Sequence, residues 1–246
     1  MAPKNETKTF EGIVLRTIDY KESDLLVDVL TSEGKECFLA RGAKKITSKN
    51  SSSLGLLTKA TFVVSISLSG KGTLKEGAPI RTMSPKEDLA SLFALNFIAE
   101  VSNAFAQYQT ESERKTYRFL DSMLSKINEG YEPLSACLIY LSYILKSNGS
   151  GLDVSECVRC HSKRNIVGVS YQEGGFLCKA HIREKDVTFA PYVLKVIRYC
   201  FLVEEGTLKD VSFEKDAAIR LLKDLAEFVK DQFGIKLKSL ELLRVL

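Results

Sequence analysis

The octapeptide Thr61-Phe62-Val63-Val64-Ser65-Ile66-Ser67-Leu68 gives the clearest indication of structure in the first part of the chain. Its even-numbered residues are all apolar and most of its odd-numbered residues are polar, which is the period of two that a half-buried β-strand shows. Residues 10–20, 25–29 and 35–41 have a similar composition, and a Gly-Lys-Gly turn leads into a further run at 73–83. Five short strands in about 75 residues predict a small closed β-barrel.

From Ser84 onward the apolar residues recur with a period of 3.6, which predicts helices. Ser84-Pro85-Lys86-Glu87 has the sequence of a capping box with proline at the first helical position, so we expect a helix to begin there. The tail 235–246 is apolar and is expected to pack back on the helices. Further helices are predicted to begin at the capping box Thr110-Glu111-Ser112-Glu113, at Pro133, at Pro191 and after Ser212, the last of them ending at Gly234. The sequence therefore predicts an α+β multidomain chain, with a β domain at 1–83 and a helical domain at 84–246.

The overall composition is that of a globular protein, with 246 residues, of which 45% are hydrophobic and 27% are charged. These values exclude disordered, collagen-like and coiled-coil classes, and they fit one or two domains. The longest uncharged stretch, Pro133–Leu145, has 13 residues, whereas a membrane span needs roughly 18 or more. Met1–Lys8 is polar and lacks the apolar core of a secretory signal, so we expect a cytoplasmic protein without a membrane partner.

Two short motifs within 152–188 have the spacing of a metal site. Cys157-Val158-Arg159-Cys160 is separated by 17 residues from Cys178-Lys179-Ala180-His181, and intervening segments of about 15–20 residues are usual for zinc. Three thiolates and an imidazole complete a tetrahedral shell, which leaves no open position for a catalytic water. The spacing therefore predicts one structural zinc per chain in a module at 152–188. The candidate ligands are Cys157, Cys160, Cys178 and His181, and His161 remains an alternative fourth ligand.

The sequence carries no recognisable signature of catalysis. It contains no Walker loop, no Gly-x-Ser-x-Gly and no His-Glu-x-x-His. Only two histidines are available for acid–base chemistry. A metal-dependent hydrolase would need an open zinc position and a general base, and the sequence shows neither. We therefore expect a binding protein and not an enzyme.

Positive charge is concentrated in one part of the chain. Residues 1–83 carry 13 basic and 9 acidic side chains, whereas residues 84–246 carry 22 of each. Cys37–Lys75 contains seven Lys or Arg residues and no Asp or Glu, which indicates contact with a polyanion, although an ordinary solvated basic loop would have the same composition. Within it, Arg41-Gly42-Ala43-Lys44-Lys45 brings three cations to the end of a strand, where they can meet successive phosphates. Tyr20, near a strand end, is a candidate for stacking on a base.

Several segments resemble the RecO family of bacterial recombination mediators. The N-terminal signature of that family is similar to Gly12-Ile13-Val14-Leu15-Arg16, Tyr20-Lys21-Glu22-Ser23-Asp24 and Arg41-Gly42-Ala43-Lys44-Lys45, in this order. Glu173-Gly174-Gly175-Phe176-Leu177-Cys178 is similar to the run before the family's second ligand pair, and Leu237-Lys238-Ser239 to its C-terminal end. The order of barrel, helices and zinc insert also agrees. The resemblance covers nearly the whole chain and implies that the barrel is an OB-fold.

The resemblance further implies a non-enzymatic, nucleoid-associated factor in DNA repair and homologous recombination. Members of the family bind single- and double-stranded DNA, anneal complementary strands and help to load recombinase onto strands coated by single-strand-binding protein. The implied protein partners are the recombination protein RecR and the acidic C-terminal tail of single-strand-binding protein. The helical domain would bind that tail, and the uncharged run Pro133–Leu145 suggests an apolar groove for it.

On this interpretation the candidate DNA-binding residues are Arg16, Lys21, Arg41, Lys44, Lys45 and Lys49. The alternative is a zinc-stabilised OB-fold protein that binds RNA or associates with the ribosome. Competition between DNA and RNA, together with a strand-annealing assay, separates the two functions.

Overall fold

The computed structural model describes residues 6–84, 88–106 and 113–244. The chain forms two compact units, of which the first comprises Met1–Gly130 with Val245–Leu246 and the second comprises Tyr131–Arg244. Residues 88–106 and 113–130 thus belong to the same unit as the β domain. The domain boundary between residues 83 and 84 stays a prediction. The predicted α+β class, with a β-sheet domain followed by helices, is confirmed.

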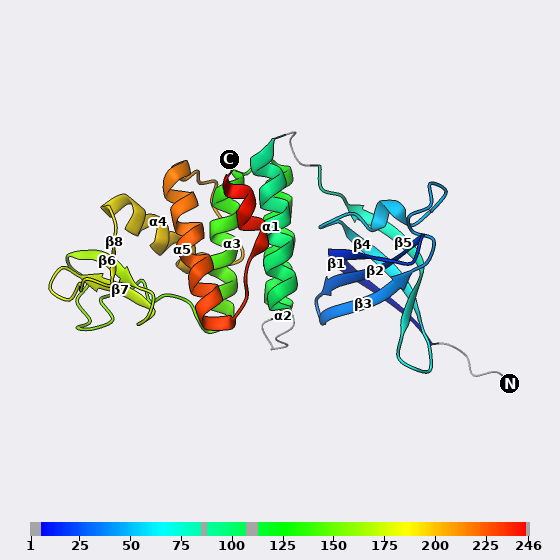
Figure 1. Cartoon of the computed structure of the whole chain (residues 1–246), viewed down its shortest axis with the longest axis horizontal. Coiled ribbons are helices and arrows are strands. Elements are labelled where there is room, and N and C mark those ends of the chain that lie inside the picture. The colour runs from blue at the N-terminus through cyan, green and yellow to red at the C-terminus, as the bar shows by residue number, and fades with distance from the viewer. Residues whose placement is uncertain (1–5, 85–87, 107–112, 245–246) are drawn as a thin grey trace. The chain divides into compact units, whose positions relative to one another are not determined.

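Five strands form the β part of the first unit, and their sheet closes in the order β1-β2-β3-β5-β4 (Figure 1). All neighbouring pairs are antiparallel except β3 and β5, which run parallel where Phe38 lies opposite Gly72. The period of two is confirmed at residues 61–64, where Phe62 and Val64 are buried inside the sheet. It does not extend through the octapeptide, because Ser65 is buried and Leu68 is 79% exposed. The rings of Phe38 and Phe62 pack 5.2 Å apart at the centre of this core. The strands are β1 (Glu6–Tyr20), β2 (Asp24–Thr31), β3 (Gly34–Ala40), β4 (Lys59–Ile66) and β5 (Gly72–Arg81).

The first unit also contains α1 (Leu89–Phe105) and α2 (Glu113–Asn128). The predicted start of α1 at Pro85 is wrong, because Asp88 is extended and its side chain caps the helix by accepting a hydrogen bond of 2.7 Å from the Ser91 amide. Residues 85–87 of that predicted capping box lie outside the described residues, and so do residues 110–112 of the second box.

The second unit is built on α3 (Pro133–Ser147), α4 (Pro191–Leu202) and α5 (Lys215–Phe233). The predicted starts at Pro133 and Pro191 are confirmed, and Gly234 ends α5 in the left-handed conformation with φ +68°. Every residue of α3 from Leu134 to Leu145 is buried. The tail ends in a 3-10 helix, η2 (Lys238–Arg244), whose Leu243 is buried as expected.

Burial along α3 removes one expectation. The uncharged run Pro133–Leu145 does not offer an apolar groove to a peptide, because its side chains form the interior of the second unit. A helix that is apolar all round belongs in a core, and its sequence alone does not distinguish this from a groove. Within the described residues, none of the helices has the length and hydropathy that crossing a membrane requires.

Candidate metal centre and nucleic-acid interface

A small insert between α3 and α4 holds the predicted metal ligands. Its strands β6 (Ile166–Ser170), β7 (Gly175–Cys178) and β8 (Val187–Thr188) form a sheet in the order β7-β6-β8 (Figure 1). In the first ligand pair, the carbonyl oxygen of Cys157 accepts hydrogen bonds from the amides of Cys160 and His161, at 3.3 and 2.8 Å. In the second pair, the carbonyl of Cys178 accepts one from His181 at 3.0 Å. Each pair is therefore a tight turn that points two side chains the same way.

The two turns bring the four predicted ligands together. The ligand atoms of Cys157, Cys160, Cys178 and His181 all lie within 4.8 Å of one another. Cys178 Sγ lies 3.7 Å from Cys160 Sγ and 3.2 Å from His181 Nδ1. Since zinc–sulfur bonds of about 2.3 Å in a tetrahedral shell place sulfurs about 3.8 Å apart, this donor set fits a zinc ion.

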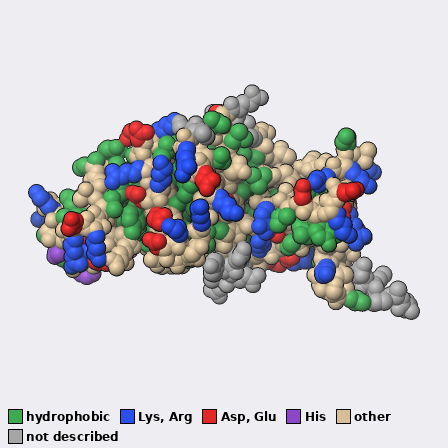
Figure 2. All heavy atoms as spheres, viewed as in Figure 1, with side chains coloured by type: hydrophobic (Ala, Val, Ile, Leu, Met, Phe, Trp, Pro, Cys, Tyr) green, Lys and Arg blue, Asp and Glu red, His purple; other side chains and the backbone are tan. Residues whose placement is uncertain are grey.

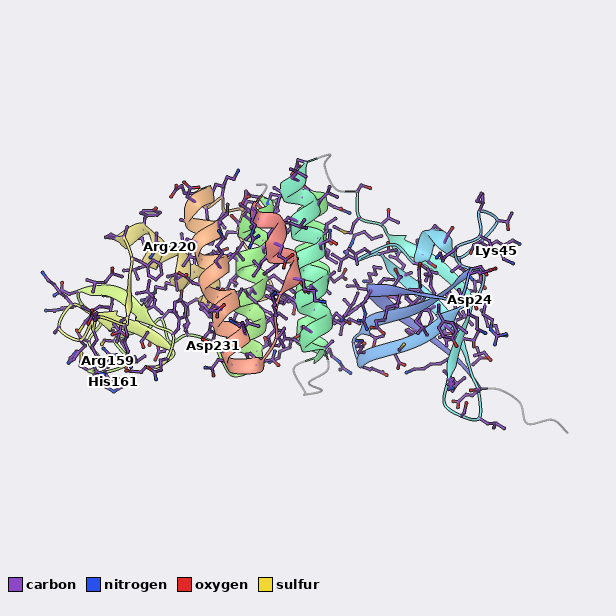
Figure 3. All side chains as sticks on the ribbon, viewed as in Figure 1. Asp24, Lys45, Arg159, His161, Arg220 and Asp231 are labelled. Atoms are coloured by element: carbon purple, nitrogen blue, oxygen red, sulfur yellow. The ribbon has the colours of Figure 1, made fainter. Side chains whose placement is uncertain are left out.

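His161 does not belong to the cluster. Its side chain is 77% exposed, and its Nδ1 lies 2.7 Å from Glu156 Oε1. The residue follows the first turn with a positive φ of 61°, and it lies at the edge of the insert in Figure 3. Of the two histidines, the structure thus brings only His181 to the cysteines.

The surroundings of Cys157 favour the form of the side chain that binds metal. Burial alone would raise the pKa of this thiol. The backbone amides of Cys178, Arg159 and Cys160 donate toward its sulfur, and together they lower the pKa to about 6. At neutral pH the sulfur is therefore mainly a thiolate, which is the species that coordinates a metal.

Two loops join at one end of the barrel and carry most of the predicted DNA-binding residues. Asp24 Oδ1 accepts a hydrogen bond of 2.8 Å from the Gly42 amide. The carbonyl of Ser23, in the turn between β1 and β2, accepts one of 3.0 Å from the Lys44 amide. Gly42 has a φ of +63°, which permits the sharp turn after β3. Figure 3 shows Asp24 and Lys45 at this end of the barrel. The turn at residues 21–23, which contains Lys21, therefore forms one surface with the basic loop at residues 41–58.

The basic loop is anchored to the barrel further along the chain. Leu54 and Leu57 are buried, whereas Leu56 is exposed. Asn50 Oδ1 accepts a hydrogen bond of 3.0 Å from the Gly77 amide in β5. These contacts attach the second half of the loop to the barrel, so that the position of its exposed cations is restricted.

The six candidate cations differ in how available their charge is. Arg16 donates to Asp28 Oδ2 at 2.7 Å, and Lys44 Nζ lies 2.7 Å from Asp19 Oδ2. In the part of the chain that the structure describes, the other four are exposed and form no ion pair with a carboxylate; they are Lys21, Arg41, Lys45 and Lys49. Figure 2 shows Lys and Arg side chains interspersed with Asp and Glu on the face in view. This surface is distinguished by four such cations on two loops that hydrogen bonds join to each other.

Tyr20 lies beside these cations at the end of β1. Its side chain is 42% exposed, and Lys21 Nζ lies 5.6 Å from the centre of its ring. Phe10, Phe38 and Phe62 pack on one another within the barrel core instead. Among these four aromatic residues, Tyr20 is thus the one with a ring exposed to a ligand.

Comparison with known proteins places the chain in a family. Residues 5–83 match the model for the N-terminal part of recombination protein O, and residues 86–241 match the model for its C-terminal part. The chain is 31% identical over 233 residues to the DNA repair protein RecO of Bacillus cytotoxicus. It is 32% identical over 235 residues to proteins of the same name from Bacillus cereus and Bacillus anthracis. Each alignment covers 93% of both chains. The chain belongs to the RecO family of DNA repair and recombination mediators.

Proposed function

We propose that this protein binds single- and double-stranded DNA through its barrel, which is an OB-fold, and anneals complementary strands without catalysing a covalent reaction. Four exposed cations without carboxylate partners, on two hydrogen-bonded loops, carry the proposal; they are Lys21, Arg41, Lys45 and Lys49. Such cations neutralise phosphates and release condensed counterions, which supplies affinity without reading a base sequence. Bases that are held only by the backbone remain free to pair, as annealing requires.

The mediator role follows from the same contact. A protein that holds one strand by its phosphates can present it to a second strand or to a recombinase. We propose that it acts in this way on strands coated by single-strand-binding protein, together with RecR. We also assign the binding of the acidic tail of single-strand-binding protein to the helical domain, at a site other than the buried α3. Titrating the tail peptide against the full chain and against RecR-bound protein tests this assignment.

The salt dependence of DNA binding tests the proposal directly. The variant Arg41→Ala/Lys45→Ala/Lys49→Ala removes three unpaired cations and leaves the Lys44–Asp19 pair in place. If all three cations meet phosphates, affinity falls alike for unrelated sequences, and the slope of log affinity against log salt decreases by about 2 units on single strands. Fluorescence anisotropy at several salt concentrations measures both quantities.

The control removes the same charge elsewhere. Lys195→Ala/Arg198→Ala/Lys223→Ala takes three exposed cations from α4 and α5, and we expect it to keep the parent slope. An equal loss of DNA affinity and of salt slope in both variants would mean that net charge, and not the barrel surface, determines binding. A stronger effect on RNA than on DNA would favour the RNA-binding alternative.

We further propose that the cluster of three cysteines and His181 holds one structural zinc ion. Its support is the compact donor set and the thiolate-favouring environment of Cys157. Four protein ligands fill a tetrahedral shell, so the ion would stabilise the insert and would not activate water. Elemental analysis of protein purified without chelators is expected to give about one zinc per chain. Zinc near zero would contradict the assignment.

A further inference from the structure

Arg159 occupies an unusual position in the insert. It lies between the two cysteines of the first ligand turn, yet its side chain is only 8% exposed. Its guanidinium donates to both carboxylate oxygens of Glu173, from Nη2 at 2.7 Å and from Nε at 2.8 Å. Nη1 donates to Asp186 Oδ2 at 2.9 Å, and Asp186 is itself 1% exposed. A buried guanidinium with two carboxylates is a fixed part of the fold, unlike a surface ion pair, which contributes little.

The same guanidinium reaches the second ligand turn. Arg159 Nη1 donates a hydrogen bond to the backbone carbonyl of His181. Glu173 lies two residues before β7, the strand that ends at Cys178, and Asp186 directly precedes β8. Asp186 also accepts a hydrogen bond of 2.8 Å from the Arg183 amide, so the loop after His181 is fixed as well. One side chain therefore joins the first turn to the second turn and to the segments on both sides of it.

We propose that Arg159 is a positioning residue for the metal site. It holds the Cys157–Cys160 turn and the Cys178–His181 turn at the separation that four ligands of one ion require. The inference rests on the zinc assignment proposed above, but it assigns a role to a residue that binds no metal itself. Only a planar fork of donors can contact Glu173, Asp186 and the His181 carbonyl at once, so lysine is not an equivalent residue here.

This role also removes Arg159 from the DNA-binding surface. A Lys or Arg residue in a zinc module is ordinarily a candidate for phosphate contact. Here both carboxylates already neutralise the guanidinium, and little of it reaches solvent. The exposed cations in or just after the same turns, Lys163, Arg164 and Lys179, keep that possibility.

The rate of zinc release tests the inference on the full chain. We compare the parent with Arg159→Met, Arg159→Lys and Glu173→Gln, and use Arg164→Met as the matched control, because Arg164 is an exposed arginine close to the same turn. Transfer of zinc to a chromophoric chelator gives the dissociation rate and the competitive affinity. We expect an affinity loss of about 10- to 100-fold for Arg159→Met, as is typical for residues that orient metal ligands. The zinc affinities of Arg159→Lys and Glu173→Gln should lie between those of Arg159→Met and the parent, and the zinc affinity of Arg164→Met should equal that of the parent.

A spectroscopic measurement separates positioning from a general loss of stability. In cobalt-substituted protein, the d–d and thiolate charge-transfer bands report ligand geometry, so we expect them to shift in Arg159→Met and not in Arg164→Met. Parent-like zinc release and cobalt spectra in Arg159→Met would overturn the inference. If that variant does not fold, Arg159→Lys and Glu173→Gln decide by the same two measurements. A parent protein that binds neither zinc nor cobalt would instead contradict the metal assignment itself.

Discussion

Asp28 lies almost fully buried between two cations. One of them is Arg16, a predicted DNA-binding residue, whose charge Asp28 neutralises. Its Oδ2 accepts from Arg16 Nη2 at 2.7 Å and lies 3.1 Å from Lys35 Nζ. Burial acts to raise the pKa of Asp28, but the hydrogen bonds from Arg16 and Lys35 lower it by more, so that the pKa lies below its ordinary value of 3.8. The guanidinium of Arg16 is half-exposed and already paired, so we expect it to contribute less to DNA binding than Arg41 or Lys45.

The depressed pKa of Asp28 predicts a pH-dependent effect on stability. Asp28→Asn leaves Arg16 and Lys35 without their carboxylate, so it should lower the free energy of unfolding at pH 7 by about 1–3 kcal/mol. A carboxylate with a lowered folded pKa stabilises the fold above pH 3.8, and this stabilisation disappears as the pH falls through the folded pKa. The difference between variant and parent should therefore shrink in acid. Urea unfolding of both proteins at pH 7 and near pH 3 measures it, and a difference that stays constant would contradict the ion-pair account.

At the scale of elements, an acidic residue of α2 joins this helix to two barrel strands. Asp121 Oδ2 accepts from Lys59 Nζ in β4 at 2.8 Å, and Oδ1 accepts from Arg81 Nη1 in β5 at 2.6 Å. Arg81 Nη1 also lies 2.8 Å from Ser125 Oγ. All three charged side chains are at most a quarter exposed. Lys59 therefore supports the fold of the first unit, although in the sequence it is one of the seven cations of the acid-free stretch Cys37–Lys75.

Removing this carboxylate is predicted to weaken the first unit. Asp121→Asn leaves Arg81 without a counter-charge and leaves Lys59 with only Glu11, whose Oε2 lies 3.9 Å from its Nζ, which should cost about 2 kcal/mol of unfolding free energy. Asp231→Asn, on the exposed face of α5, is the control and should change stability by less than about 0.5 kcal/mol. Chemical denaturation of the two variants beside the parent gives both values. Equal effects would mean that the link between α2 and the barrel does not stabilise the unit.

The elements themselves were predictable where the signal is local. The period of two at 61–64, proline at the first position of α3 and Gly234 after α5 are each local signals within a few residues, so the sequence is sufficient to locate them. The start of α1 could not be predicted from local signals, because both Ser84 and Asp88 are residues that can cap a helix. In the structure Asp88 is the cap. The ligand turns were predictable for the same local reason as the strands.

Charge pairing between elements is where the sequence is insufficient. Arg16 lies opposite Asp28 in the register of β1 and β2. A hairpin built on the three-residue turn 21–23 would have indicated this pair, since the register follows from the turn. No comparable signal exists for the Asp121 bridge or for the contacts of Arg159, because their partners are distant in the sequence or depend on the folded insert. The number of basic residues in the barrel could therefore be predicted from the sequence, but the number of them without a carboxylate partner could not.

At the scale of the whole molecule, the proposed DNA-binding surface and the proposed metal site lie in different units. The four unpaired barrel cations lie in the unit that contains Met1–Gly130, and the four candidate ligands lie in the unit that contains Tyr131–Arg244. The insert has strands of only five, four and two residues. Its apolar cluster is centred on Cys157, Leu177 and Cys178, two of which are candidate ligands. A core this small needs a further stabilising interaction, and the proposed zinc ion would supply it.

Metal removal should therefore affect the fold of the insert but not DNA binding by the barrel. A strong chelator is expected to unfold the insert, so that limited trypsin digestion cuts within 157–188, where the metal-loaded protein resists. The barrel does not depend on the insert for its core or for its loop contacts. DNA affinity and its salt slope, measured on the same chelated sample, should consequently stay within about twofold of the parent, since counterion release depends on the barrel cations alone. Loss of DNA binding upon chelation, with the far-UV signal of the β domain retained, would show instead that the insert forms part of the DNA-binding surface. Lys163, Arg164 and Lys179 would then be the residues to exchange.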